Sequence, residues 1–232
     1  MTLQGKIVAV TGGFGQLGVA VVRAALDAGA QVAALDRARQ PADAKALAGA
    51  LALGDIDLAE SSAATKAVDQ VVAQLGGLDA LINIAGTFRW ESLETGSVDT
   101  WDLLYRVNLR SAVNTSHAAL PHLTKRGGGR IINIGAGAAA AKAGAGMGAY
   151  TASKAGVAKL TEALAEEVKD RGITVNAILP SIIDTPANRA DMPNADFSRW
   201  VPPRAIADVI VFLLSNQASA VTGALIPVSG RV

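Results

Sequence analysis

Short apolar runs alternate with longer amphipathic stretches along the chain. The short runs are rich in Val, Ile and Leu and lack a regular apolar–polar alternation, which predicts strands buried on both faces. These predicted strands are Lys6–Val10, Gln31–Leu35, Leu51–Ile56, Ala80–Ile84, Arg130–Ile134, Thr174–Leu179 and Leu225–Val228. The longer stretches predict helices at Gln16–Ala28, Pro41–Gly49, Glu60–Leu75, Val98–Lys125, Tyr150–Asp170 and Arg204–Ser215.

Regular alternation of strand and helix is typical of a doubly wound α/β fold, in which helices cover both faces of a parallel sheet. We expect one Rossmann-type domain over residues 1–232 with a mainly parallel seven-stranded sheet, because the chain contains no internal repeat and no linker. In such folds ligands bind outside the carboxyl ends of the strands, near the point where the strand order reverses.

Composition and charge exclude several classes of function. The chain has 21 basic and 20 acidic residues among 232, so a strongly basic nucleic-acid surface is not expected. The absence of cysteine excludes a disulfide scaffold, a thiolate zinc site and a cysteine nucleophile. No apolar run approaches the roughly 18 residues of a membrane span, and the first run ends in glycines, which favours a strand over a signal peptide. We expect a cytoplasmic protein that binds a small-molecule substrate and neither nucleic acid nor membrane.

Two segments differ from ordinary connections. Between Gly135 and Ala149 every residue except Lys142 and Met147 is Gly or Ala. This composition suits a surface loop of small residues, and it also suits backbone that must approach a ligand closely. Residues 181–203 are long for a connection, which favours a substrate loop over a simple linker.

The first predicted strand leads into a glycine-rich turn and then a helix, an arrangement typical of dinucleotide binding. Gly13, Gly15 and Gly18 satisfy the pattern G-x-G-x-x-G. Backbone without side chains can approach a pyrophosphate, whose charge is favoured by the helix N-terminus. We expect the cofactor to contact Gly12, Gly13, Phe14, Gly15, Gln16, Leu17 and Gly18.

Acidic residues follow the second and third predicted strands. A carboxylate at Asp36 can accept hydrogen bonds from the adenosine ribose hydroxyls and would repel the 2′-phosphate of NADP. Arg37 follows directly and softens that repulsion, so NAD(H) is favoured over NADP(H) without being required. Asp57 has two interpretations, a hydrogen bond to the adenine amino group or an N-cap of the next helix.

Tyr150 and Lys154 stand four residues apart, on one face of a predicted helix. A phenol with an ordinary pKa of about 10 exchanges protons poorly at neutral pH. A neighbouring ammonium favours the phenolate and lowers that pKa. The spacing Y-x-x-x-K is by itself common and mostly structural. The position of the pair, about 130 residues after the glycine motif and directly after the Gly/Ala segment, favours general acid/base chemistry.

Together these motifs resemble those of short-chain dehydrogenases/reductases, and the resemblance extends over essentially the whole chain. The matching motifs are the turn Thr11–Gly18, Asn83-Ile84-Ala85-Gly86, Asn108 in VNLRSA, the Tyr150/Lys154 pair and Asn176-Ala177-Ile178-Leu179-Pro180. The resemblance implies that Tyr150 is the general acid/base, that Lys154 holds the nicotinamide ribose and lowers the tyrosine pKa, and that Asn108 positions a proton-relay water. It also implies cofactor contacts at Asn83, Ala85, Gly86, Pro180, Ile183 and Thr185.

The sequence departs from the family pattern in three places. The family usually has a serine about 13 residues before the tyrosine that donates to the substrate oxygen, whereas this region reads Gly135-Ala136-Gly137. Loss of one such donor typically costs about 10²–10³ in rate. The substrate therefore develops no alkoxide, or another group donates, or catalysis is lost. In addition, Gln16 replaces a common glycine, and Ser181 follows Pro180 where the family usually has glycine.

Dihydropteridine reductases, one branch of this family, are similar in their glycine turn, their strand exit without the serine and their acidic residue after the second strand. The stretch from Asp184 to Trp200 also resembles their C-terminal loop. Hydride delivery to a quinonoid dihydropterin places charge in a delocalised ring, so a single alkoxide donor matters less. Asn108 and the Asn83 motif instead resemble those of ordinary carbonyl reductases.

Three functions remain open: NADH-dependent reduction of a quinonoid dihydropterin, reduction or oxidation of a ketone, alcohol or 3-oxoacyl thioester with a substitute for the serine, and a non-catalytic dinucleotide sensor. The presence of Tyr150, Lys154 and Asn108 argues against the sensor, because binding alone needs no proton donor. The resemblance implies a homodimer or homotetramer packed through the helices that begin near Val98 and Tyr150. We expect no metal site, since His117 and His122 fall on different helix faces without a carboxylate cluster.

Overall fold

The computed structural model describes the backbone of residues 1–232 and all side chains except that of Ala44. One sheet contains every strand in the order β3-β2-β1-β4-β5-β6-β7, and all neighbouring strands are parallel. The strands are β1 (Ile7–Thr11), β2 (Gln31–Leu35), β3 (Leu51–Leu53), β4 (Ala80–Asn83), β5 (Gly129–Ile134), β6 (Ile173–Pro180) and β7 (Leu225–Val228). The predicted seven-stranded parallel sheet is confirmed.

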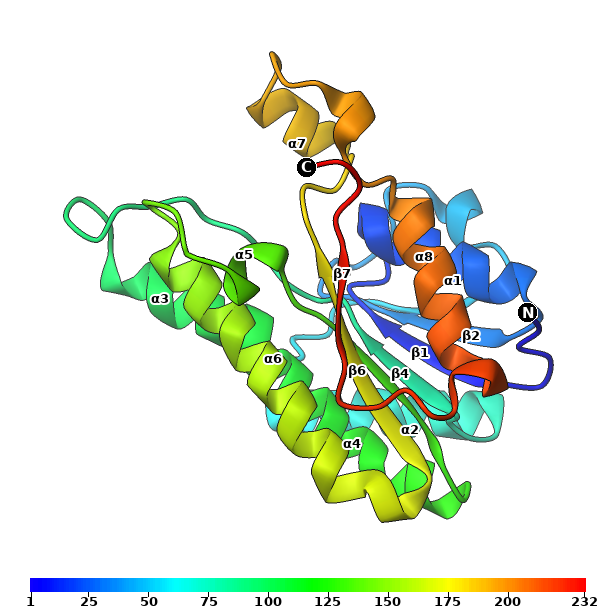
Figure 1. Cartoon of the computed structure of the whole chain (residues 1–232). Helices are drawn as coiled ribbons and strands as arrows, with labels where there is room; N and C mark the ends of the chain where they lie inside the picture. The colour runs from blue at the N-terminus through cyan, green and yellow to red at the C-terminus, as the bar shows by residue number, and fades with distance from the viewer.

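Helices connect the strands and cover both faces of the sheet (Figure 1). The α-helices are α1 (Gln16–Asp27), α2 (Ser61–Leu75), α3 (Val98–Leu104), α4 (Ser111–Lys125), α5 (Gly137–Ala140), α6 (Gly148–Val168), α7 (Pro186–Asp191) and α8 (Pro203–Leu214). Single 3₁₀ turns are η1 (Ala44–Leu47), η3 (Lys169–Arg171), η4 (Phe197–Arg199) and η5 (Asn216–Ala218), and η2 (Tyr105–Arg110) is a π-helical segment between α3 and α4.

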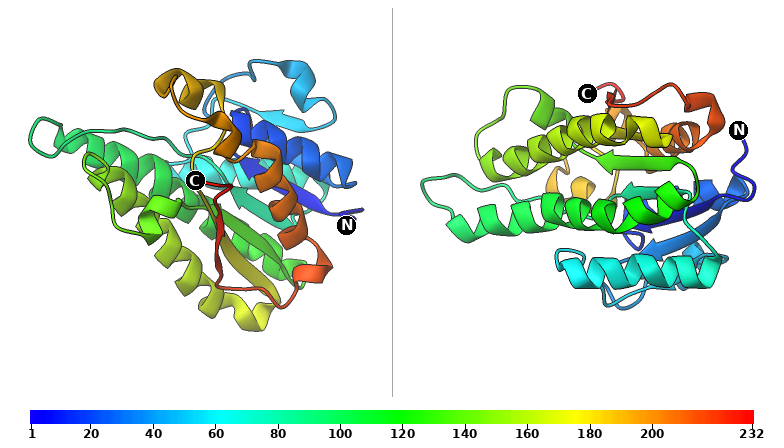
Figure 2. Two further views of the ribbon diagram at one scale, coloured as in Figure 1. Left: turned by 45° about the horizontal axis from the view of Figure 1, so that its top comes forward. Right: turned by 90° about the horizontal axis from the view of Figure 1, so that it is seen from below.

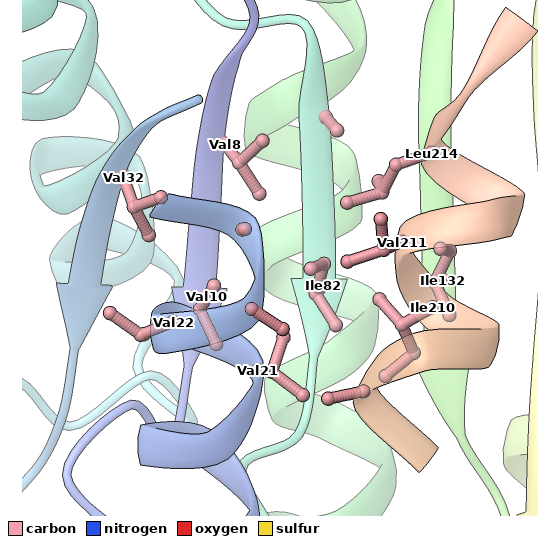
Figure 3. Packing of buried hydrophobic residues seen from close by; sticks show 14 of the residues in the cluster. Val8, Val10, Val21, Val22, Val32, Ile82, Ile132, Ile210, Val211 and Leu214 are labelled. Carbon is pink, nitrogen blue, oxygen red and sulfur yellow. The ribbon is translucent and has the colours of Figure 1, made fainter. Parts of the chain in front are cut away.

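Each face of the sheet buries its own apolar layer. Helices α1 and α8 pack on one face, where Val21 and Ile210 meet Val10 and Ile82 of the strands (Figure 3). Helices α2, α4 and α6 cover the other face, and Figure 2 shows the sheet between these layers. Because both faces are buried, the strands need apolar side chains at successive positions, which explains their continuous Val, Ile and Leu runs.

Three predicted elements differ from the structure. The helix predicted over Pro41–Gly49 is wrong, because only the turn η1 forms there. In this stretch Leu47 is buried and packs against the core. Burial of this one side chain is too small to offset the cost of nucleating a helix. The third strand ends at Leu53 rather than Ile56, since Asp55 takes a positive φ of 59°. The helix predicted over Val98–Lys125 is interrupted by η2.

The strand order reverses between β1 and β4, whose connections leave in opposite directions across the sheet. β1 is followed by α1 and β2 on one side, whereas β4 is followed by the chain that leads to β5 on the other. The carboxyl ends of β1 and β4 therefore border an open crevice, which is the expected ligand site of a doubly wound fold.

Candidate active site

A cavity of about 700 Å³ lies in this crevice. Its lining comes from the turn after β1, the ends of β2, β3 and β4, the segment η2 with the start of α4, and the chain after β6. The lining residues are Gly12, Phe14, Gly15, Gln16, Leu17, Gly18, Asp36, Arg37, Ala38, Gln40, Ala42, Ile56, Asp57, Leu58, Ala59, Ile84, Ala85, Gly86, Val107, Ser111 and Thr185. Twelve of the residues predicted to bind the cofactor are among them.

The glycine turn is tightly constrained by its surroundings. Gly12 has a φ of +64°, and a Cβ there would lie 2.9 Å from the backbone nitrogen of Ala85. A Cβ on Gly18 would collide with the backbone oxygen of Gly12. Gly13 packs instead toward β2, where a Cβ would lie 2.7 Å from the Cβ of Ala34, and it does not line the cavity. Only glycine permits this close approach of the turn to β2 and β4.

The first turn of α1 presents free backbone amides to the cavity. Its N-cap is Gly15, in an extended conformation without a side-chain hydrogen bond, and the first turn carries no acidic residue. Gln16, Leu17 and Gly18 of this turn line the cavity. Unsatisfied N–H groups together with the helix dipole favour an anionic group at this position. The turn therefore fits a pyrophosphate, as the sequence predicts.

Asp36 is held rigidly at the rim of the same cavity. One carboxylate oxygen accepts a hydrogen bond from the backbone N–H of Phe14 over 3.0 Å, and the other accepts one from Ala38 over 2.9 Å. The carboxylate thus connects the end of β2 to the glycine turn. Arg37 lines the cavity beside it and is exposed. This arrangement fits an adenosine ribose whose hydroxyls donate to Asp36.

The N-cap interpretation of Asp57 is wrong, because the N-cap of α2 is Glu60, and the hydrogen bond of Asp57 to adenine stays a prediction. The Oδ1 of Asp57 accepts the backbone N–H of Ala59 over 3.0 Å, which caps the turn before α2. Its Oδ2 accepts a 2.8 Å hydrogen bond from Arg106, whose guanidinium also donates to Glu60 over 2.7 Å. Asp57 still lines the cavity. Arg106, which belongs to no motif in the sequence, therefore fixes the wall of the cavity from η2.

Tyr150 lies near the start of α6, and neither Tyr150 nor Lys154 is among the residues that line the cavity. The Tyr150 ring packs edge-on against Phe88, with ring centroids 4.9 Å apart and an interplanar angle of 82°. Burial raises the pKa of Tyr150, which is the opposite of the lowering expected from a neighbouring ammonium. The cause is removal of the phenolate from water on burial.

Lys154 is almost fully buried, with 5% of its surface exposed. Its Nζ donates a 2.7 Å hydrogen bond to the backbone oxygen of Ile134, at the end of β5. Burial lowers the pKa of Lys154 to about 8. The hydrogen bond to Ile134 fixes the position of the ammonium against the sheet.

Asn108 lies in η2, and both its amide oxygen and its amide nitrogen form hydrogen bonds within the protein. Its Oδ1 accepts the backbone N–H of Thr87 over 2.7 Å, while Nδ2 donates to the backbone oxygen of Thr87 and to Ser153 Oγ. Ser153 in turn donates to the backbone oxygen of Tyr150 over 2.7 Å. Asn108 therefore connects the chain after β4 to the helix that carries Tyr150. Its predicted water-relay role stays a prediction.

Asn83 belongs to a buried polar network rather than to the cavity lining. Its Nδ2 donates to Asn133 Oδ1 over 2.9 Å and to Ser116 Oγ over 3.1 Å, and its Oδ1 accepts from Thr115. Asn133 continues the network by donating to Thr161 of α6. These hydrogen bonds hold α4 and α6 against the ends of β4 and β5 and satisfy the buried amides. Asn83 thus supports the site by holding these helices and strands in place.

The exit of β5 supplies no side-chain hydroxyl between Gly135 and Gly137. Ala136 is buried and extended, and Gly137 opens the short helix α5. A Cβ on Gly137 would lie 3.3 Å from the backbone oxygen of Pro180, so this exit packs closely on the end of β6. Gly137 therefore serves close packing of the two strand ends, whereas residues 140–145 further along are exposed, as the surface-loop interpretation predicts.

Residues 181–203 form a structured cap over the carboxyl end of the sheet, visible at the top of Figure 1 around α7. Asp184 forms a two-point ion pair with Arg189, at 2.6 and 2.8 Å, and the guanidinium of Arg189 lies 4.9 Å from the centre of the Phe197 ring. Trp200 is buried, and Ile183 pairs with Val201. Thr185 caps α7 and lines the cavity, while Ile183 and Pro180 lie outside that lining.

Several cavity residues were not predicted as site residues, although Ile84 lies in the Asn83 motif and Val107 and Ser111 lie in VNLRSA. The residues that were not predicted are Ala38, Gln40, Ala42, Ile56, Leu58, Ala59, Ile84, Val107 and Ser111. Some of them adjoin residues that were predicted, since Ala38 follows Arg37 and Ile84 precedes Ala85. Most have small or apolar side chains without a chemical signature, so only these motifs or proximity to Asp36, Asp57 and Ala85 could have indicated them.

Among the described residues, no helix is both long and apolar enough to cross a membrane. Likewise, no group of three or more potential metal ligands occurs among the described side chains. His122 instead pairs with Asp69 over 2.9 Å. The cytoplasmic location stays a prediction.

Comparison with known proteins agrees with the geometry. The model of the short chain dehydrogenase family matches residues 6–196. The chain belongs to the short-chain dehydrogenase/reductase family. It is 36% identical to the 3-oxoacyl-(acyl-carrier-protein) reductase FabG of Pseudomonas aeruginosa, over 99% of this chain and 98% of that protein. It is 31% identical to 2-(S)-hydroxypropyl-CoM dehydrogenase 3 of Xanthobacter autotrophicus, over 98% of this chain and 96% of that protein.

A solved structure gives the same result. A mutant short-chain dehydrogenase/reductase of Serratia marcescens is 31% identical, covers 100% of this chain and 99% of its own, and superposes with a TM-score of 0.88. This short-chain dehydrogenase/reductase is therefore an oxidoreductase of a family that uses NAD(H) or NADP(H). The more specific resemblance to dihydropteridine reductases stays a prediction.

Proposed function

We propose that this enzyme transfers hydride between NAD(H) and a small carbonyl–alcohol pair, with Tyr150 as the general acid/base. The observation that carries the proposal is the arrangement around Tyr150: Ser153 holds its backbone, Phe88 holds its ring, and Lys154 lies one helical turn further along α6. The two relatives named above are a 3-oxoacyl reductase and a hydroxypropyl dehydrogenase, which supports a carbonyl or alcohol substrate.

The cavity supports NAD(H) as the cofactor, which supplies or accepts the hydride when it is bound. The amides at the start of α1 would hold its pyrophosphate, and Asp36 would accept hydrogen bonds from its adenosine ribose. The carboxylate of Asp36 would repel a 2′-phosphate, and the positive charge of Arg37 beside it would offset part of this repulsion. We accordingly propose a preference for NAD(H) over NADP(H).

Tyr150 would donate its phenolic proton to the substrate oxygen during reduction and take it back during oxidation. Lys154 would hold the nicotinamide ribose and, through its positive charge, lower the cost of forming the phenolate. Asn108 would keep α6 in position through Ser153. Since Gly135–Gly137 carries no hydroxyl, the remaining hydrogen bond to the substrate oxygen would have to come from backbone N–H or water.

The absent hydroxyl also supports a second candidate, reduction of a quinonoid dihydropterin. The negative charge that develops during this reaction spreads over a conjugated ring, so a substrate-oxygen donor beyond Tyr150 contributes less. Neither of the two relatives named above carries that activity in its name.

The test measures NADH oxidation with a panel of ketones and 3-oxoacyl thioesters beside a quinonoid dihydropterin. Tyr150→Phe should lower turnover at least about 100-fold while NADH still binds, because general acid/base groups contribute about 10²–10⁴. Tyr105→Phe, at the exposed second tyrosine, is the matched control and should retain activity. Turnover of the pterin alone would favour the second candidate. Equal loss of NADH binding and turnover in Tyr150→Phe would contradict the assigned role.

We also propose that the enzyme is a homodimer or homotetramer. An apolar surface runs along α3, η2 and the start of α4, where Val98, Trp101, Leu103, Tyr105 and Val113 are between 36% and 73% exposed. Helix α6 packs against both α3 and η2 beside this surface. Large exposed apolar side chains are typical of association surfaces. A second copy of the chain would bury them.

A further inference from the structure

A second cavity, of about 220 Å³, lies at the opposite end of the sheet from the cofactor site. It opens at the amino ends of β1, β4 and β5, next to the turn between α4 and β5. Its walls carry three cationic side chains, Lys6, Arg126 and Arg130, with Asp79 as the acidic residue among them. The enzyme's proposed chemistry uses none of these residues.

The sheet register directs two of these cations to the same face. Val8, Ala80 and Arg130 lie opposite one another on the adjacent strands β1, β4 and β5. Val8 and Ala80 face the layer covered by α1 and α8, and side chains in register on adjacent strands share a face. Arg130 and Lys6, which stands two residues before Val8, both line the cavity together with the small side chain of Ala80.

The acidic residue does not neutralise these two cations. Asp79 accepts two hydrogen bonds from Arg126, at 3.0 and 3.2 Å, and another from the backbone N–H of Ile7 at 2.8 Å. Its side chain is 12% exposed and fully engaged by these donors. Among the described side chains, Lys6 and Arg130 form no ion pair. With three cations and one carboxylate in its walls, the cavity keeps an excess of two positive charges.

The guanidinium of Arg130 retains unused hydrogen-bonding capacity inside the protein. Its Nη1 donates to the backbone oxygen of Gly129 over 2.9 Å. Its Nε is buried and has no hydrogen-bond partner, and it is the one such side-chain atom among the described residues. Burial also lowers the pKa of Arg130, because nothing nearby compensates the loss of water. A buried N–H without a partner calls for an explanation such as a bound anion.

We propose that this cavity binds a doubly charged oxyanion, a phosphate or phosphoryl group, between Lys6 and Arg130. A guanidinium edge matches two oxygens of a phosphate, and the ammonium adds a point charge. The excess of positive charge favours a dianion over a carboxylate. The adjacent backbone at Gly127, Gly128 and Gly172 takes positive φ values and carries no side chain that would obstruct entry.

The test follows the thermal unfolding midpoint of the full chain as inorganic phosphate is added, at constant ionic strength set with chloride. A ligand that binds only the folded state raises the midpoint with its concentration. Lys6→Gln and Arg130→Gln should each weaken the apparent phosphate affinity about tenfold or more, because each removes a charged donor. Lys66→Gln, at an exposed lysine of α2 that forms no ion pair among the described side chains, is the matched control.

Further arms distinguish the source of the anion and its site. Methyl phosphate tests a phosphoryl group carried by a larger molecule, and acetate, a monoanion, should bind at least about tenfold more weakly than phosphate. Phosphate that binds only at the glycine turn keeps its affinity in Lys6→Gln and Arg130→Gln, and this outcome would overturn the proposal. Arg130→Lys covers the case in which Arg130→Gln does not fold, since it keeps the charge and should retain part of the affinity. The readout does not depend on hydride transfer, so it stands apart from the proposed function.

Discussion

Lys154 Nζ donates a hydrogen bond to the backbone oxygen of Ile134, 2.7 Å away. This contact joins α6 to the carboxyl end of β5 and holds the ammonium in a site where 5% of the residue is exposed to solvent. The burial lowers the pKa of Lys154 to about 8. The same contact therefore sets the position of the ammonium beside Tyr150 in surroundings that also shift its protonation.

The lowered pKa of Lys154 predicts a change in stability with pH. Between about pH 8 and the ordinary lysine pKa of about 10.4, the unfolded chain binds more protons than the folded one, so stability should rise with pH through this window. Below pH 8 the folded state buries Lys154 in its charged form, and this burial lowers the free energy of unfolding by about 3 kcal/mol. Lys154→Met should lose this rise. Denaturant unfolding at pH 7 and pH 10 measures it, and an equal rise in both proteins would contradict the burial argument.

Asp36 should determine the choice between the two nicotinamide cofactors. Asp36→Ser removes the negative charge and keeps a short hydroxyl that can accept from the N–H of Phe14 or Ala38. With Arg37 in place, the ratio of kcat/KM for NADH to that for NADPH should fall at least about tenfold, since a repulsion near the 2′-phosphate disappears. Asp170→Ser, an exposed carboxylate far along the chain, is the control and should leave the ratio unchanged.

The strand exit without a hydroxyl offers a direct test of the carbonyl proposal. Ala136→Ser and Gly137→Ser each place a hydroxyl on that exit. At least one of them should raise turnover of a ketone about tenfold or more, because one such donor is worth about 10²–10³ in rate. Ala138→Ser, one residue further on, serves as the control. If neither variant improves turnover, a donor is already in place or the substrate needs none.

Arg106 should act on cofactor binding rather than on the hydride step. Its guanidinium bridges Asp57 and Glu60, and all three side chains are 38% to 55% exposed, so the pairs contribute little to stability. Arg106→Gln should raise the KM for NADH a few-fold, with kcat nearly unchanged and the free energy of unfolding changed by less than about 1 kcal/mol. Arg110→Gln, in the same π-helical segment, is the matched variant. A fall in kcat at constant KM would show that Arg106 acts elsewhere.

The proposed assembly depends on the apolar surface along α3, η2 and α4. Val113→Asp places a charge on that surface, where Val113 is 41% exposed in the single chain. Burial of this charge between two copies would be costly, so the variant should dissociate into monomers at micromolar concentration. Sedimentation velocity measures the change. Thr124→Asp, at the far end of α4, should leave the assembly intact, and a wild-type protein that sediments as a monomer would refute the proposal.

Local patterns in the sequence determined the fold class and the chemistry-bearing motifs. Continuous apolar runs required strands buried on both faces, the glycine turn required backbone without Cβ atoms, and the four-residue spacing of Tyr150 and Lys154 required one helix face. These are properties of neighbouring residues, whereas the resemblance to a family needed the motifs from Thr11 to Pro180 together. Where burial was insufficient, as over Pro41–Gly49, the local pattern predicted a helix that does not form.

The tertiary structure decided which partners each side chain has. The sequence could not indicate that Arg106 donates a hydrogen bond to Asp57, or that the side-chain amide of Asn83 donates to Asn133 and Ser116. It also could not indicate that burial raises the pKa of Tyr150. Such contacts join residues 33 to 50 positions apart, and pKa values depend on how much water the packed chain excludes. Distance in space and exclusion of water are set by packing of the whole domain, which no local pattern encodes.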